Sequence, residues 1–124
     1  MNEIDQLFAD FTEALRRGDC NAVAEMVTDD AEFWSPGAPA VRGRDHVRSV
    51  MRDACEQYLV ERTWDEIERV TGDDFMVSVG IERTRAMPRA GGDAVEIVQR
   101  GWTMARRGAD GRWRFARGIT NREA

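Results

Sequence analysis

The chain has 124 residues, of which 42% are hydrophobic and 33% charged, a balance that fits one domain over residues 1–124 and argues against disorder. The net charge of −5 disfavours nucleic acid as a partner, because binding to phosphates requires a basic surface. No apolar run approaches the roughly 20 residues that cross a bilayer, and the acidic first residues lack a signal-peptide pattern. We therefore expect a cytoplasmic protein without a membrane partner.

Helical periodicity dominates the first half of the chain. Apolar side chains recur at helical spacing up to Arg17, and Gly18 is suited to end that helix. Asp19 can cap a short second helix, and a turn-rich stretch, Pro36 to Pro39, precedes a third. The predicted elements are helices over residues 3–17, 19–30 and 44–58, with a brief strand over 31–35.

The second half alternates with a period of two, which predicts strands over residues 63–70, 75–83, 94–106 and 112–120. Gly108 to Gly111 is expected to form the last hairpin turn. If that loop has an even length, Trp102 pairs with Arg117 or Ile119, and Arg100 pairs with Ile119 or Asn121. Helices followed by antiparallel strands predict an α+β fold with the helices on one sheet face.

Five short motifs in order carry a resemblance to a known family: residues 14–19, 28–31, 35–39, 41–44 and 111–116. With them the chain resembles the SnoaL-like branch of the nuclear-transport-factor-2-like (NTF2-like) superfamily, and more narrowly the SgcJ/EcaC-like proteins of the DUF4440 type. The resemblance implies a cone-shaped, cystatin-like fold, an apolar pocket inside it and a homodimer. It implies no single function, because this fold hosts isomerases, dehydratases, cyclases and binding modules.

The residues required for ketosteroid isomerisation, as the resemblance implies them, are not found. A base is expected before Pro36, where Ser35 stands, and a hydroxyl on the first helix, where Phe11 stands. The resemblance also implies an acid on a late strand, and Arg100 stands at that position. We therefore expect no isomerisation of a Δ5-3-ketosteroid.

Other catalytic and metal sites are also disfavoured. His46 is the only histidine, and it is expected to lie at a helix entry rather than in a His–Asp pair. Cys20 and Cys55 form no CxxC pair, so we expect two inert thiols, no metal and no cofactor. The epoxide-hydrolase members of the family that this chain resembles use an Asp–Arg–Asp trio. Arg100 could supply its arginine, but no carboxylate is expected on the same sheet face.

One sheet face is expected to be buried because six of its eight side chains are large and apolar. Two arginines interrupt it, Arg100 and Arg117, and a buried guanidinium needs an anionic partner. The partner is either a ligand or one of the acidic residues of neighbouring strands. The eight residues are Val98, Arg100, Trp102, Met104, Trp113, Phe115, Arg117 and Ile119, and the four acids are Glu66, Glu68, Glu82 and Glu96.

The pattern favours a pocket that binds a small hydrophobic anion, with or without transforming it. The alternative is a non-catalytic dimeric scaffold with a vestigial cavity. Apolar or small residues on both faces of the strands over residues 60–70 and 75–83 predict a homodimer through the outer face of the sheet, burying more than about 1,000 Å². The expected ligand-binding residues are Phe11, Phe33, Ser35, Arg100, Trp102, Phe115, Arg117 and Asn121.

Overall fold

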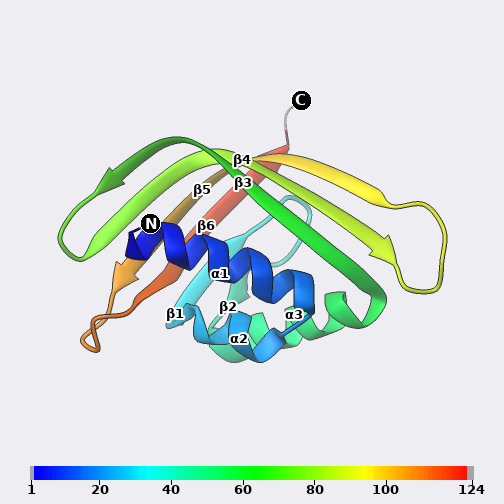
Figure 1. Ribbon diagram of the computed structural model, residues 1–124, viewed down its shortest axis with the longest axis horizontal. Helices are drawn as coiled ribbons and strands as arrows, with labels where there is room; N and C mark the ends of the chain where they lie inside the picture. Colours follow the sequence, from blue (N-terminus) through cyan, green and yellow to red (C-terminus); the bar gives the residue numbers. More distant parts are fainter. Residues whose placement is uncertain (1, 123–124) are drawn as a thin grey trace.

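The computed structural model, which describes residues 2–122, has three helices beneath an arched sheet of six strands (Figure 1). The strand order is β2-β1-β6-β5-β4-β3, and every pairing is antiparallel except that of β1 with β6. The α+β class and the packing of helices on one sheet face are confirmed. The elements are α1 Glu3–Arg17, α2 Cys20–Glu25, β1 Val27–Trp34, β2 Val41–Arg42, α3 Arg44–Gln57, β3 Tyr58–Thr71, β4 Phe75–Pro88, β5 Val95–Arg107 and β6 Trp113–Arg122.

Helix α1 has the predicted bounds because both of its ends carry strong signals. The Asn2 side chain accepts a hydrogen bond from the backbone N–H of Asp5, and Gly18 ends the helix with a φ of 68°. Its buried residues, among them Leu7 and Leu15, lie on the stripe that faces the sheet. This helix forms one wall of the molecule's interior.

The second helix is shorter than expected. Met26 ends it, and Val27 begins β1 and is buried on the sheet rather than on a helix. Tyr58, which was expected in α3, begins β3 in the same way. Strands β3 and β4 are 14 residues long each, so their paired ends and the β4–β5 loop extend past the helices (Figure 1).

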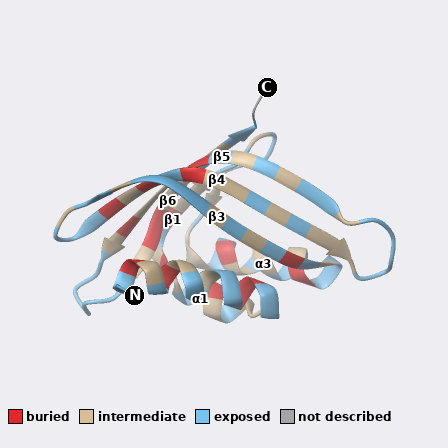
Figure 2. Cartoon of the chain, turned by 45° about the horizontal axis from the view of Figure 1, so that its top comes forward, coloured by how far each residue is buried: buried red, intermediate tan, exposed pale blue. Residues whose placement is uncertain are grey.

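The core lies between α1, α2, α3 and the concave face of the sheet. On β4 the buried residues are Met76, Ser78 and Gly80, whereas Phe75 and Val79 are exposed and Val77 is half-buried. Figure 2 shows this alternation of buried and exposed positions along the strands. Among residues 2–122, no helix is long and apolar enough to cross a membrane.

Candidate functional site

A cavity of about 370 Å³ lies between the concave face of the sheet and the helices. Its volume is within the usual range of small-molecule sites. Rings and aliphatic side chains make most of its wall, and the helices contribute Phe8, Phe11, Thr12, Val47, Val50, Met51 and Ala54. The cavity is therefore shaped to hold an apolar body.

Glycines in the sheet make room for the rings of the cavity wall. Gly80 on β4 is paired with Gly101 on β5, and the indole of Trp64 lies across both. A Cβ at Gly101 would lie only 2.6 Å from Trp64 Cζ3, and a Cβ at Gly118 would lie 2.8 Å from Phe33 Cδ1. The rings can lie flat on the sheet because these positions carry no side chain.

A partly buried hydrogen-bond chain holds Trp64 in this position. Its Nε1–H donates to Ser78 Oγ over 2.9 Å, and the fully buried Ser78 hydroxyl donates to Glu66 Oε2 over 2.6 Å. Glu66 also accepts from Arg69 Nε over 2.9 Å. Arg69 lies 5.7 Å from the centroid of the Phe8 ring, which stacks on Trp64 at 6.3 Å. The five side chains form a closed ring of contacts that joins α1, β3 and β4.

One region of the cavity is polar. Arg62 Nε donates to Thr84 Oγ1 over 3.3 Å and lies 3.7 Å from Glu82 Oε1. The side chains of Arg62 and Glu82 are 28% and 19% exposed, so a guanidinium and a carboxylate face the cavity together in a mostly buried position. Such a pair can hold an oxygen of a ligand and can also move a proton.

Five of the eight predicted site residues border the cavity: Phe11, Phe33, Ser35, Trp102 and Phe115. Trp102 does so from a strand position that faces outward, since it pairs with the exposed Val79. Ser35 and Phe11 are thus in the cavity, where they offer neither a carboxylate nor a phenol. Within the described chain, Arg100, Arg117 and Asn121 are not among the lining residues.

The sheet face expected to be buried is the outer one, and that expectation was wrong. Trp102 pairs with Ile119 and Arg100 with Asn121, which are among the pairs expected for an even loop. The loop itself is odd, because Arg107 pairs with Trp113 across the five residues 108–112, and only a bulge restores those pairs. However, Trp102 is 36% and Ile119 40% exposed. A bulge between Met104 and Ala105 changes the parity of β6, so that Phe115 faces the core although the alternation placed it with Arg117. The six residues of this outer face are Val98, Arg100, Trp102, Met104, Arg117 and Ile119.

The two arginines of that face have partners other than the four acids expected. Arg117 donates to the Asp30 backbone carbonyl over 2.8 Å and pairs with its carboxylate at 3.5 Å. Arg100 donates to Asn121 Oδ1 over 3.2 Å. The Thr28 hydroxyl, followed by Arg106 and Arg117, lowers the pKa of Asp30. These contacts give Arg117 a structural role at the join of β1 and β6.

The single histidine lies at the surface, outside any cluster of possible metal ligands in residues 2–122. His46 is exposed in the first turn of α3, as predicted, and its Nδ1 accepts from the backbone N–H of Arg42 over 3.1 Å. Among residues 2–122, no three His, Cys, Asp or Glu side chains cluster as metal ligands.

Sequence reasoning missed four polar or aromatic residues of the cavity. Glu82 was expected only as an ion-pair partner, and Arg62, Trp64 and Thr120 were not among the predicted site residues. The signal that could have found them is the pair Gly80 and Gly101, since small residues at matching places in two strands mark a face that carries rings. Arg62, Trp64, Glu82 and Thr120 all belong to that face.

The outer face of the sheet carries an exposed apolar row. Val79 pairs with Trp102, Trp102 with Ile119, and Ile119 with Trp34, so the four side chains lie side by side across four strands. All four are 36–51% exposed. Large contiguous apolar surfaces of this kind mark interaction sites.

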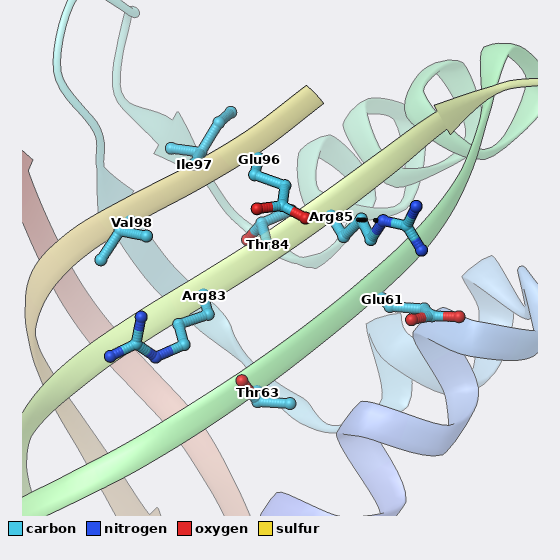
Figure 3. Close-up of a pocket in the computed structure, with 8 residues that line it drawn as sticks. All are labelled: Glu61, Thr63, Arg83, Thr84, Arg85, Glu96, Ile97 and Val98. Atoms are coloured by element: carbon cyan, nitrogen blue, oxygen red, sulfur yellow. Dashed lines mark ion pairs between the residues drawn. The ribbon is translucent and has the colours of Figure 1, made fainter. Parts of the chain in front are cut away.

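A second hollow of about 210 Å³ lies along β3, β4 and β5 (Figure 3). Its arginines are already paired: Arg83 with Asp65 at 2.9 Å, and Arg85 with Glu96 at 3.7 Å. The cavity beneath the sheet, with its rings and its Arg62 guanidinium, is the better candidate site.

The family model of the SnoaL-like domain matches residues 8–116. This chain belongs to the SnoaL-like domain family. No curated protein sequence matches it. The solved structures similar to it include NTF2-like proteins, in agreement with the resemblance found in the sequence.

Three of these structures define the fold. A ketosteroid isomerase-like protein from Erwinia carotovora atroseptica is 24% identical with a TM-score of 0.81, covering 98% of this chain and 95% of that one. An NTF2-like protein with a cystatin-like fold from Novosphingobium aromaticivorans is 18% identical with a TM-score of 0.77, covering 95% and 78%. A proposed scytalone dehydratase from the same organism is 12% identical with a TM-score of 0.87, covering 98% and 83%. At these identities the likeness shows the fold, here the cone-shaped cystatin-like one.

Proposed function

We propose that this SnoaL-like protein binds a small ring-containing ligand in the cavity, with an anionic or carbonyl oxygen of the ligand held by Arg62. The observation that carries the proposal is the mostly buried guanidinium of Arg62 in a wall made otherwise largely of rings and aliphatic groups. The guanidinium can donate two parallel hydrogen bonds to a carboxylate or enolate. Arg62 thus takes the place that the sequence assigned to Arg100 and Arg117.

Glu82 adds a second function to the same region. With Arg62 it can bind a ligand that presents an acceptor and a donor together, such as an acid with a neighbouring hydroxyl. Its carboxylate can also take or return a proton of a bound ligand. Binding and turnover are therefore to be followed in the same assay.

The test compares 2-naphthoate with 2-naphthamide by calorimetry. A charge-assisted hydrogen bond contributes roughly 1.5–3 kcal/mol, so the acid should bind about tenfold or more tightly than the amide. Arg62→Met should remove this preference, and Arg62→Lys should keep part of it. Arg117→Met is the matched control, because that guanidinium binds Asp30 outside the cavity. Equal binding of acid and amide by the wild type would refute the proposal.

A second candidate function, self-association as a dimeric scaffold, is favoured by the apolar row on the outer face. Covering Trp34, Val79, Trp102 and Ile119 with the same face of a second copy would bury them in an isologous interface. Trp102→Arg should then give a monomer in light scattering at micromolar concentration, where the wild type is a dimer. Ile67→Arg, an exposed position outside the row, is the control and should leave the dimer intact. A monomeric wild type would exclude this function.

A further inference from the structure

One hydroxyl in the cavity wall is buried and has no hydrogen-bond partner among residues 2–122: Oγ1 of Thr120. Thr120 lies on β6 opposite Gly101, where its Cγ2 is 3.5 Å from the place a Cβ of Gly101 would take. The ring of Trp64 covers that same glycine. The hydroxyl therefore lies in apolar surroundings, where an unmade hydrogen bond destabilises the folded state.

Thr103 provides a direct comparison. It also lines the cavity, and its Oγ1 donates to the backbone carbonyl of Arg117 over 3.2 Å. The same side-chain type on the neighbouring strand thus finds a partner in the protein, whereas Thr120 does not. A buried unsatisfied group in a binding cavity is a group that a ligand can satisfy.

We infer that Thr120 is a second polar contact for the ligand, and that the ligand is an elongated molecule with an oxygen at each end. This inference rests on the proposed function, because Arg62 is taken to hold the first oxygen. Valine has nearly the shape of threonine and would fill the same space without an unpaired hydroxyl. The position therefore carries a polar group that packing does not require.

The sheet topology sets the length of the ligand. Arg62 is on β3 and Thr120 on β6, three strands apart in the order β6-β5-β4-β3. At the usual strand spacing the two backbones are about 14 Å apart across the sheet. The register adds an offset of four residues, about 13 Å along the strands, because Arg62 is level with Ile97 on β5 and Thr120 with Gly101. The long Arg62 side chain covers part of this span, and a body of about two rings covers the remainder. A single ring is too short to contact both residues.

The experiment uses a series of aromatic acids with a hydroxyl at the far end: 4-hydroxybenzoate, 6-hydroxy-2-naphthoate and 4′-hydroxybiphenyl-4-carboxylate. Each is compared by calorimetry with the same acid lacking the hydroxyl, on wild type and on Thr120→Val. The wild type should bind at least one of the two-ring hydroxy acids about three- to tenfold more tightly than its partner without the hydroxyl. Thr120→Val should lose that difference and bind the plain acids unchanged.

Thr103→Val is the matched control, because its hydroxyl is already used within the protein. It should keep the preference for the hydroxy acid. Arg62→Met should weaken the binding of all the acids, with and without the far hydroxyl.

The melting temperature of the ligand-free protein gives an independent readout. Thr120→Val should raise it or leave it unchanged, since an unsatisfied hydroxyl is replaced by a methyl group, whereas Thr103→Val should lower it. A lower melting temperature for Thr120→Val would overturn the inference, because the hydroxyl would then be satisfied within the folded protein.

The two proposals fail in distinguishable ways. If acids bind in an Arg62-dependent manner but neither two-ring hydroxyl matters, the inference about Thr120 is wrong and the proposed function stands. If none of the acids binds, both are overturned together.

Discussion

The indole ring of Trp64 occupies the space that a side chain at Gly101 would need, on the strand two positions away in the sheet. The ring thereby forms part of the cavity wall and leaves the volume above it open. The size of the cavity thus depends on a residue that has no side chain at all.

Gly101→Ala should therefore displace Trp64 into the cavity or distort β5. Such overpacking costs about 1–3 kcal/mol, and it should reduce both the free energy of unfolding and the affinity for two-ring acids. Urea unfolding followed by tryptophan fluorescence measures the first effect, and calorimetry the second. Gly91→Ala, in the β4–β5 loop, has no atom near the added Cβ but a φ of 97° that disfavours alanine. It is therefore a control for the binding measurement, and it should leave the affinity for two-ring acids unchanged even where the backbone strain lowers stability. An alanine at 101 that leaves both quantities unchanged would show that Trp64 adapts freely.

Ser78→Ala should remove the hydrogen bond that orients the Trp64 indole. The hydroxyl both accepts from Trp64 Nε1 and donates to Glu66, so its removal leaves two polar groups without their partner. We expect a loss of about 1–3 kcal/mol in the free energy of unfolding and a changed near-ultraviolet circular dichroism of the tryptophans. The exposed Ser49→Ala is the control. An unchanged spectrum in Ser78→Ala would mean that stacking on Phe8 alone orients the indole.

The β5–β6 turn should make stability depend on acid pH. The Arg114 guanidinium, with the backbone N–H of Arg112, lowers the pKa of Asp110 from 3.8 to about 2. Because the folded-state pKa is the lower one, this contribution is present in full above about pH 4–5 and is lost as the pH falls towards 2. Asp110→Asn should therefore melt below the wild type at neutral pH, and the difference should vanish near pH 2. Asp93→Asn serves as the control, and a gap between Asp110→Asn and wild type that is constant over this range would contradict the assignment.

The two thiols should differ in reactivity. Burial, followed by the neighbouring Cys20, raises the pKa of Cys55, so less thiolate is present at neutral pH than for an ordinary cysteine. We expect Cys20, which is partly exposed, to be alkylated first, and Cys55 only slowly until the pH is well above 8. Peptide mass spectrometry after timed labelling, with Cys20→Ser and Cys55→Ser as references, measures both rates. Fast labelling of Cys55 at neutral pH would contradict this prediction.

The sequence was sufficient for the elements with strong local signals. The helix from Glu3 to Arg17 has a regular apolar stripe and a cap at each end. The pairing of Trp102 with Ile119 was among those expected, but it results from a five-residue loop together with the bulge between Met104 and Ala105, and neither was predicted from the sequence. The ends of β3 and β4 were underestimated, because the pairing that extends them is made with a neighbouring strand rather than within the segment.

The inside and outside of the sheet could not be predicted by counting apolar residues. The concave face is rich in small residues such as Gly80 and Gly101, since it receives the rings of Trp64 and of the helices. The convex face keeps Val79, Trp102 and Ile119 exposed, so it is the more apolar one by count. The prediction that Arg100 and Arg117 face the cavity failed for the same reason. Only the structure shows that the Arg62 side chain lines it.

The parallel pairing of β1 with β6 joins the first strand of the chain to the last. During synthesis the ribosome releases the helices and β1 long before β6, and at about 5–20 residues per second the interval is several seconds. Until then the nascent chain lacks Gly118 and Thr120, which line the cavity, and β1 lacks its main neighbour. Truncation before β6 should therefore leave a chain that binds chaperones rather than ligand, because this domain can finish folding only after β6 has left the ribosome.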